Sequence, residues 1–174
     1  MVHAKLGIAA DNSGKLVTQV RRAAQEIAHR RKIDLILCDG SPGIGCPVIA
    51  SLTGASLALF VVEPTVSGMH DFHRIAQLTT RLGMPGVLTV NKADLNPGSA
   101  EEIETDAAKY GIVAVGRIPY DRDVTQAQIA CKTVVEFSNG PAAQAIRVVW
   151  TATRKRLESV PDSTISGLVQ IDSR

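Results

Sequence analysis

The stretch LILCDGSPGIG, residues 35–45, is an apolar run that ends in an aspartate and continues into a glycine-rich turn. Longer amphipathic stretches, with apolar residues every three or four positions, alternate with apolar runs of this kind. The other runs are Lys5–Ala9, Ser56–Val62, Gly86–Val90 and Ile112–Ile118. Such alternation is typical of βαβ units. The sequence therefore predicts an α/β fold, with a doubly wound, mostly parallel sheet and helices on both faces.

Helices are expected at residues 14–30, 47–53, 68–82, 99–110 and 142–157, with another after Asp123. We expect Ser67 and Ser99 to cap two of them, because a serine hydroxyl accepts hydrogen bonds from first-turn N–H groups. The runs at 56–62, 86–90 and 112–118 are rich in Val, Leu and Ile, which predicts strands that are buried on both faces. Residues 1–160 are predicted to form one domain. The polar tail 161–174 is assigned no element.

Composition excludes several classes of protein. The chain has 174 residues, with 45% hydrophobic and 21% charged residues, which excludes disorder. The near balance of 19 basic and 17 acidic residues, with 3% aromatic residues, argues against a nucleic-acid partner. No apolar run has the length of a membrane span, and no signal peptide is recognisable, so we expect a cytoplasmic protein.

Asp39, at the end of the first quoted run, is the first candidate site residue. In nucleotide-binding proteins of the Walker B type, an aspartate at the end of an apolar strand orients Mg²⁺, usually through a water. The glycines that follow, Gly43 among them, let backbone N–H groups approach a phosphate. The alternative is a strand that ends in a tight Pro-Gly turn, capped by Asp39. Residue types alone leave both interpretations open.

Asn91-Lys92-Ala93-Asp94 follows another apolar run and indicates recognition of a base. The Asn91 amide offers both a donor and an acceptor, as a purine edge requires. Asp94 either accepts two N–H groups of guanine or caps the next helix. The turn Ile118-Pro119-Tyr120-Asp121 ends the next run and is placed to close over a purine ring.

A phosphate-binding P-loop is not recognisable. Such a loop needs GxxxxGK[ST] between a strand and a helix. The only Gly-Lys pair is Gly14-Lys15; the preceding Gly7 is too distant and Leu16 follows the lysine. We therefore predict that Lys15 is an exposed residue in the first turn of a helix. The three cysteines form no CxxC pair, which excludes a disulfide framework and a self-contained zinc site.

The motifs occur in a distinctive order over about residues 3 to 157. They are LG (6–7), NSGKLV (12–17), VR (20–21), DGSPGIGCPVIAS (39–51), EPT (63–65), SGMHD (67–71), NKADLN (91–96) and IPYD (118–121). In this order they resemble the C-terminal part of MinD/ParA-type P-loop ATPases, most closely the branch with an inserted ferredoxin (4Fe-4S) domain. The resemblance implies that Asp39 lies near Mg²⁺ through a water and that the N–H of Gly43 faces the γ-phosphate, both in switch II. It also implies that Asn91 recognises adenine, with Pro119 and Asp121 beside the base.

Members of this family normally begin with a strand and a Walker A loop, which in this branch is followed by the ferredoxin domain. Neither is recognisable here, so the resemblance implies a C-terminal segment that acts as an ATPase only if the Walker A part is supplied. The implied cofactors are ATP and Mg²⁺, and the intact relatives serve iron–sulfur or redox tasks. The implied partner is a second copy, as a homodimer, or a complementing N-terminal P-loop/ferredoxin segment. Cys46 is the one candidate cluster ligand, but a cluster shared by two subunits needs a second cysteine from each, so we predict no cluster.

Two alternative functions remain. The Asn-Lys-x-Asp motif also occurs in GTP-binding proteins, but the D-x-x-P-G form after Asp39 is similar to the MinD class and favours adenine. The other alternative is a non-enzymatic, degenerate half-domain that binds a partner. Loss of the first strand and the P-loop helix should expose a sheet edge and apolar surface that need covering.

Overall fold

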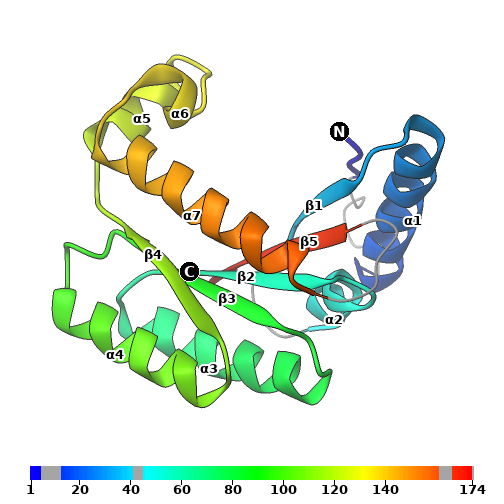
Figure 1. Cartoon of the computed structure of the whole chain (residues 1–174), viewed down its shortest axis with the longest axis horizontal. Coiled ribbons are helices and arrows are strands. Elements are labelled where there is room, and N and C mark those ends of the chain that lie inside the picture. Colours follow the sequence, from blue (N-terminus) through cyan, green and yellow to red (C-terminus); the bar gives the residue numbers. More distant parts are fainter. Residues whose placement is uncertain (5–12, 41–44, 161–165, 174) are drawn as a thin grey trace.

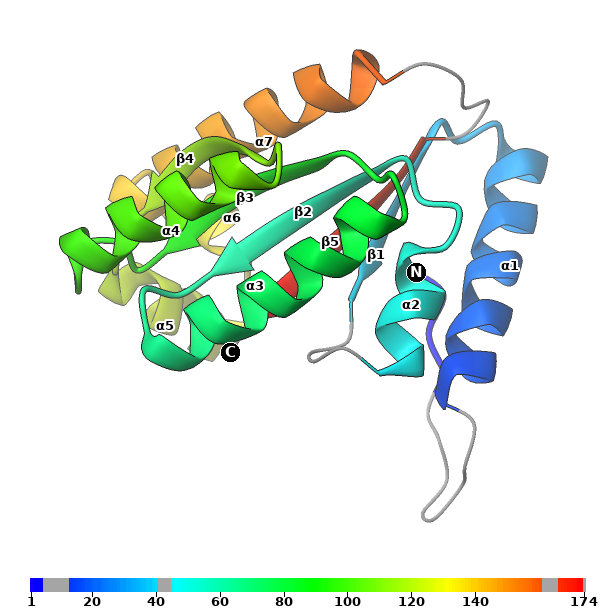
Figure 2. The ribbon, with the colours of Figure 1, turned by 90° about the horizontal axis from the view of Figure 1, so that it is seen from below.

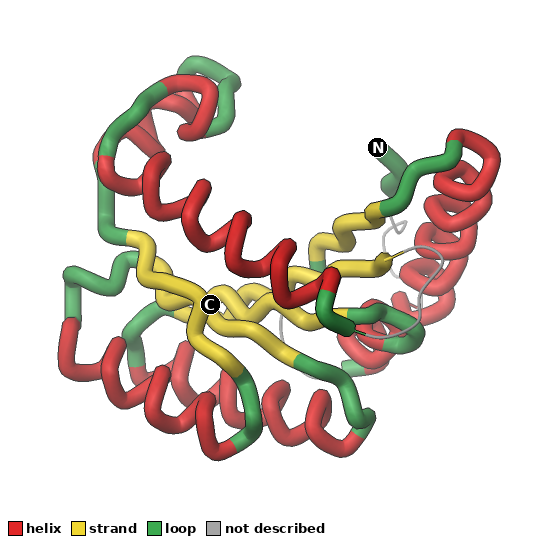
Figure 3. Tube along the Cα trace, viewed as in Figure 1, coloured by secondary structure: helices red, strands yellow, loops and turns green. Residues whose placement is uncertain are grey.

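The computed structural model describes residues 1–4, 13–40, 45–160 and 166–173. One sheet contains β1 (Leu35–Asp39), β2 (Leu57–Val62), β3 (Gly86–Asn91), β4 (Val113–Ile118) and β5 (Ser166–Ser173). The strand order is β1-β5-β2-β3-β4, and every pair of neighbours is parallel. Figure 3 shows this sheet in yellow, with helices on either side. The prediction of a doubly wound α/β fold is confirmed.

Helices cover the two faces of the sheet unequally. Helix α3 packs on β2 and β5, and α4 packs on β3 and β4, on one face, whereas α7 packs on β3 and β4 on the other (Figures 1 and 2). Helix α1 packs against α2 and β1 at the opposite end of the sheet. No described helix has the length and apolar character of a bilayer span. The bounds are α1 (Ser13–Arg31), α2 (Cys46–Leu52), α3 (Val66–Arg81), α4 (Pro97–Lys109), α5 (Arg122–Ile129), α6 (Val134–Phe137) and α7 (Pro141–Glu158).

The strand β5 belongs to the tail 161–174, to which the sequence assigns no element. It lies between β1 and β2 and pairs in parallel with both. Backbone groups make this pairing, and they are the same whatever the side chains are. The sequence SGLVQIDS therefore does not predict a central strand. The strand predicted at Lys5–Ala9 lies outside the described residues.

The face under α3 and α4 holds the main core. Phe60 of β2 and Phe72 of α3 are fully buried and meet edge to face, with ring centroids 5.5 Å apart. Leu88, Ile75 and Ile103 continue the same cluster. On the α7 face the buried cluster is smaller and contains Leu57, Leu59, Val87 and Leu157. The strands β2 and β3 are buried on both faces, as their apolar sequences predict.

The same prediction is wrong for β4, whose residues are all exposed or only partly buried. This strand is last in the sheet and pairs with β3 alone, so Val113 remains 50% exposed. The register between β3 and β4 also shifts after Leu88, opposite Gly116, which has a φ of +147°. Hydrophobic content alone does not distinguish an edge strand from a central one.

Both predicted helix caps are wrong by two or three positions. Helix α3 is capped by Thr65, whose hydroxyl accepts a hydrogen bond from the Gly68 N–H at 3.0 Å. Helix α4 is capped by Asn96, whose side-chain oxygen accepts from the Ser99 N–H at 3.2 Å. Pro97 accounts for the early start of α4, because its fixed φ suits the first helical position.

Candidate functional site

The carboxyl ends of the parallel strands meet at one edge of the sheet, where ligands bind in open α/β folds. A cleft of about 560 Å³ lies there, on the α7 face. Its floor is formed by residues of β1, β2 and β3, and its walls by the turn 118–121 and by α5, α6 and α7. We call it the strand-end cleft. Its volume lies within the range of small-molecule sites.

Three of the four predicted nucleotide-binding residues line this cleft: Asn91, Pro119 and Asp121. All three are partly buried. The ends of β3 and β4 are held together, since the Ala93 N–H donates to the Ile118 carbonyl at 3.1 Å. Within the described part of the chain, the Asn91 amide makes no hydrogen bond, so its donor and acceptor are free for a ligand. The fourth residue, Gly43, lies outside the described residues.

Asp94 does not line the strand-end cleft. Its Oδ1 accepts a hydrogen bond of 2.6 Å from the backbone N–H of Tyr120. It therefore fixes the turn 118–121 from the neighbouring strand end. It does not cap α4, because Asn96 has that role.

Asp121 joins the starts of two helices. Its Oδ1 accepts from the Asp123 N–H at 2.9 Å, which caps α5, and its Oδ2 accepts from the Ala142 N–H at 3.1 Å, in the first turn of α7. The hydroxyl of Ser138 donates to Asp123 beside it. A Cβ at Gly140 would lie 3.0 Å from a carboxylate oxygen of each aspartate, so a side chain there would crowd this junction.

Lys92, Tyr120 and Trp150 also line the cleft. The sequence places Tyr120 in the turn expected to close over a purine ring, but it assigns no role to Lys92, to its partner Glu63 or to Trp150. Lys92, in a left-handed conformation with φ of 54°, pairs its Nζ with Glu63 Oε1 at 2.7 Å. Tyr120 is 50% exposed and Trp150 is 37% exposed, and both line the cleft. The motifs EPT and NKAD point to the strand ends, but only the sheet order shows that these ends are neighbours. For Trp150, the apolar stripe of α7 is the one available signal.

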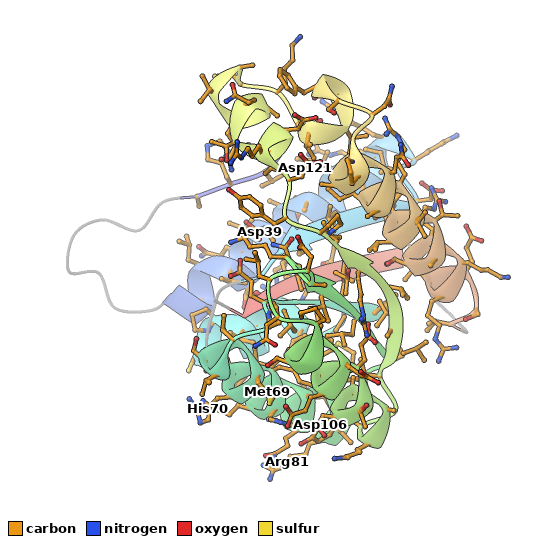
Figure 4. All side chains as sticks on the ribbon, turned by 90° about the vertical axis from the view of Figure 1, so that its left-hand side faces the viewer. Asp39, Met69, His70, Arg81, Asp106 and Asp121 are labelled. Carbon is orange, nitrogen blue, oxygen red and sulfur yellow. The ribbon has the colours of Figure 1, made fainter. Side chains whose placement is uncertain are left out.

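Asp39 lies at the exposed carboxyl end of β1 and lines a different groove. That groove, of about 540 Å³, lies between α1 and β1. Figure 4 shows Asp39 and Asp121 on the same side of the molecule, with Asp106 on the opposite side. Asp39 does not line the strand-end cleft, so Asp39 and Asn91 do not share one cleft.

Two of the remaining sequence candidates lie near the starts of helices. Cys46 is exposed at the start of α2, and Lys15 is exposed in the first turn of α1, as predicted. The described residues contain no group of three or more His, Cys, Asp or Glu side chains that could hold a metal ion.

No family model matches the sequence. The chain is similar to two proteins of Methanocaldococcus jannaschii. It is 27% identical to the uncharacterized protein MJ0578 over 150 residues, which are 86% of this chain and 49% of that one. It is 22% identical to the uncharacterized ATP-binding protein MJ0547, over 79% of this chain and 54% of that one. The chain thus spans about half the length of the curated relatives it matches.

Solved structures of MinD proteins share the fold. The Pyrococcus furiosus cell division ATPase MinD superposes with a TM-score of 0.66 at 17% identity, over 83% of this chain and 59% of that one. The Aquifex aeolicus MinD cell division protein gives a TM-score of 0.64 at 24% identity, over 86% and 63%. The Pyrococcus horikoshii MinD complexed with Mg-ADP gives 0.63 at 16% identity, over 87% and 60%. The chain therefore has the fold of the MinD cell division ATPases.

Proposed function

We propose that this chain is the base-recognition half of a MinD-like ATP-binding protein, an ATPase whose phosphate-binding part is supplied by a separate segment. One observation carries the proposal: Asn91, Pro119 and Asp121 converge on one cleft at the carboxyl edge of a MinD-like sheet. Similarity to the ATP-binding protein MJ0547 supports the choice of nucleotide.

In this proposal Asn91 recognises the base. Its amide donates to one ring nitrogen of adenine and accepts from the exocyclic amino group, a pairing that suits this side chain. Pro119 lies beside the ring. Asp121 acts through the backbone, because its oxygens already hold the starts of α5 and α7. The hydrogen bond from Tyr120 to Asp94, outside the cleft, favours adenine over guanine, since guanine would need that carboxylate for its own N–H groups.

The proposal includes a magnesium ion near Asp39, held through a water, and a γ-phosphate beside Gly43. Asp39 is exposed and belongs to no group of three or more His, Cys, Asp or Glu side chains among the described residues. Mg²⁺ retains several waters and is usually held by one or two carboxylates together with substrate phosphates. Asp39 fits that pattern as a single carboxylate that would act through one of the retained waters, with the nucleotide supplying the phosphate oxygens.

We further propose that the partner is a complementing N-terminal segment or a second copy of the chain. The length of the relatives, about twice the matched region, supports a missing segment. The link of the intact protein to iron–sulfur or redox tasks rests on the sequence resemblance to the ferredoxin-fused branch.

Calorimetry with ATP and GTP, in the presence of Mg²⁺, tests the proposal. We expect ATP to bind more weakly than about 0.1 mM and more tightly than GTP, because a phosphate-binding loop normally adds much of the affinity. Asn91→Ala should weaken ATP binding about tenfold, the value of a hydrogen-bonded pair. Asn139→Ala, an exposed asparagine outside the cleft, is the matched control. Micromolar ATP binding would contradict the half-site, and equal binding of ATP and GTP would contradict adenine recognition.

The second candidate function is a partner-binding module. It is favoured by the apolar lining of the strand-end cleft, where Leu37 is 55% exposed and Trp150 is 37% exposed. If neither ATP nor GTP binds at about 5 mM, the nucleotide proposal fails and the partner-binding function is preferred.

A further inference from the structure

A second cluster of polar side chains lies between α3 and α4, away from the strand-end cleft. His73 of α3 lies between Asp106, in the last turn of α4, and Tyr110, the residue that ends this helix. None of these three residues lines the strand-end cleft. Because α4 directly precedes the parallel strand β4, its end lies at the amino edge of the sheet, opposite the edge that holds the cleft. The proposed function does not use this cluster.

The contacts of Asp106 determine which nitrogen of His73 carries the proton. Asp106 Oδ1 accepts a hydrogen bond of 2.5 Å from Lys109, and its Oδ2 lies 3.2 Å from His73 Nε2. The hydrogen bond from Lys109 lowers the pKa of Asp106, and His73 lowers it further, so this side chain is a carboxylate and has no proton to donate. In the neutral ring, His73 Nε2 therefore carries the hydrogen and Nδ1 presents its lone pair.

The hydroxyl of Tyr110 lies 3.2 Å from His73 Nδ1. Because Nδ1 has no hydrogen in this tautomer, the hydroxyl is the donor of the bond. The ring of Tyr110 meets the fully buried Phe72 edge to face, with centroids 6.3 Å apart, and its backbone N–H donates to the Ala107 carbonyl at 3.0 Å. A hydroxyl, a base and a residue that orients the base are thus aligned, which is the arrangement of an activated nucleophile.

We infer that this cluster is a reactive site in which Tyr110 is the nucleophile, His73 is its general base and Asp106 positions His73. The substrate class is a small activated acyl compound, and the His73 side chain, 33% exposed, leaves the cluster open to it. The Tyr110 oxygen bonds to the acyl carbon, the bond from that carbon to its leaving group breaks, and the phenolic proton passes through His73 Nδ1 to the leaving group. The product is an uncharged ester. A phosphoryl group is disfavoured, since its negative charge would lie close to the Asp106 carboxylate.

Acetylation of the full chain by N-acetylimidazole tests the inference. The chain has two tyrosines, so Tyr120 is an internal control. Tyr120 is 50% exposed and its hydroxyl makes no hydrogen bond in the described part of the chain, whereas Tyr110 is partly buried. Exposure alone predicts faster acetylation of Tyr120. We expect Tyr110 to react at least about tenfold faster, because a general base contributes a factor of this size or larger. Peptide mapping by mass spectrometry measures both rates, and acetylation of Tyr120 that is as fast or faster would overturn the inference.

A pair of histidine variants separates the base from its surroundings. His73→Gln removes the base and should slow acetylation of Tyr110 at least about tenfold, with the rate at Tyr120 unchanged. His70→Gln is the matched control, because His70 lies on the same helix, is 68% exposed and pairs with Asp71. It should leave both rates unchanged. An unchanged Tyr110 rate in His73→Gln, or an equal loss in His70→Gln, would overturn the assignment of the base.

A second pair tests the positioning role of Asp106. Asp106→Asn keeps the size of the side chain but removes the carboxylate that fixes the tautomer of His73, so acetylation of Tyr110 should slow at least about tenfold. Asp106→Glu restores a carboxylate and should recover part of the rate. Circular dichroism checks that both variants are folded. Equal rates in the two variants would overturn the role of Asp106.

Discussion

The two faces of the sheet differ in how completely they are covered. Under α3 and α4 the side chains of β2 and β3 meet a continuous core around Phe60 and Phe72. On the opposite face α7 packs on β3 and β4, and the strand-end cleft lies beside it. Parallel sheets are normally buried on both faces. We therefore expect the closed face to provide most of the stability of the fold, whereas the candidate site lies on the open face.

Removal of an aromatic ring from each face should give the largest difference between the two faces in the free energy of unfolding. Phe72→Ala should lower the free energy of unfolding by about 3–5 kcal/mol, because the ring is fully buried against Phe60 and Tyr110. Trp150→Ala should cost about 1–2 kcal/mol, since Trp150 remains 37% exposed on the open face. Urea unfolding followed by circular dichroism measures both. Equal losses would contradict the division between a stabilising face and a site face.

Alanine substitutions at two glycines of α3 and α4 test how tightly the helices of the closed face pack against the strand ends. A Cβ at Gly68 would lie 2.5 Å from the carbonyl oxygen of Glu63, so Gly68→Ala should cost about 1–3 kcal/mol of unfolding free energy. A Cβ at Gly98, in the first turn of α4, would lie 3.8 Å from its nearest neighbour. Gly98→Ala should therefore stabilise the protein by up to about 1 kcal/mol through helix propensity. Thermal or urea unfolding measures the free energy of unfolding of both variants. An unchanged value in Gly68→Ala would contradict the expected clash and show that the backbone at Glu63 shifts easily.

At the strand ends, Asp94 holds the turn 118–121, which lines the strand-end cleft, by accepting a hydrogen bond from the Tyr120 N–H. Asp94→Ala should weaken adenosine binding about fivefold, because the turn loses one charge-assisted hydrogen bond. Asp94→Asn keeps an acceptor oxygen at this place and should recover most of the affinity. If the Asp94 carboxylate instead contacts the ligand directly, both variants should lose adenosine binding, which would contradict the positioning role.

The smallest expected effect concerns the pH dependence of stability, through an ion pair on the helices of the closed face. A hydrogen bond from Lys109 lowers the pKa of Asp106 below its ordinary value, and His73 adds to the shift. A lowered pKa in the folded state adds stability above the ordinary pKa, and this stability disappears as the pH falls through the folded-state value. Asp106→Asn should thus reduce the difference in urea midpoint between about pH 5 and about pH 2.5. An unchanged difference would exclude Asp106 as a source of acid sensitivity.

Much of the fold follows from the sequence because hydrophobic periodicity separates helices from strands. The convergence of Asn91, Pro119 and Asp121 also follows, since the carboxyl ends of parallel strands meet at one edge. The position of β5 does not follow, because it depends on backbone pairing with strands far away in the sequence. The exposure of β4 likewise depends on its place at the edge of the sheet.

Details of the site depend on single contacts that no sequence pattern specifies. Asp94 precedes Tyr120 by 26 residues, and only the sheet order brings the carboxylate to that N–H. The pairing of Lys92 with Glu63 likewise depends on neighbouring strand ends. Trp150 reaches the cleft because α7 crosses the open face, and the apolar stripe of α7 alone does not specify which part of the sheet the helix covers.

Trp150 is the only tryptophan of the chain and lines the strand-end cleft, so its fluorescence provides the most direct test. Titration with adenosine should change the Trp150 emission saturably, with a midpoint weaker than about 0.1 mM. The change should be lost in Asn91→Ala and retained in Asn139→Ala. If calorimetry detects adenosine binding but the emission stays constant, or if Asn91→Ala binds as the wild type does, the cleft is not the nucleoside site and the account is contradicted.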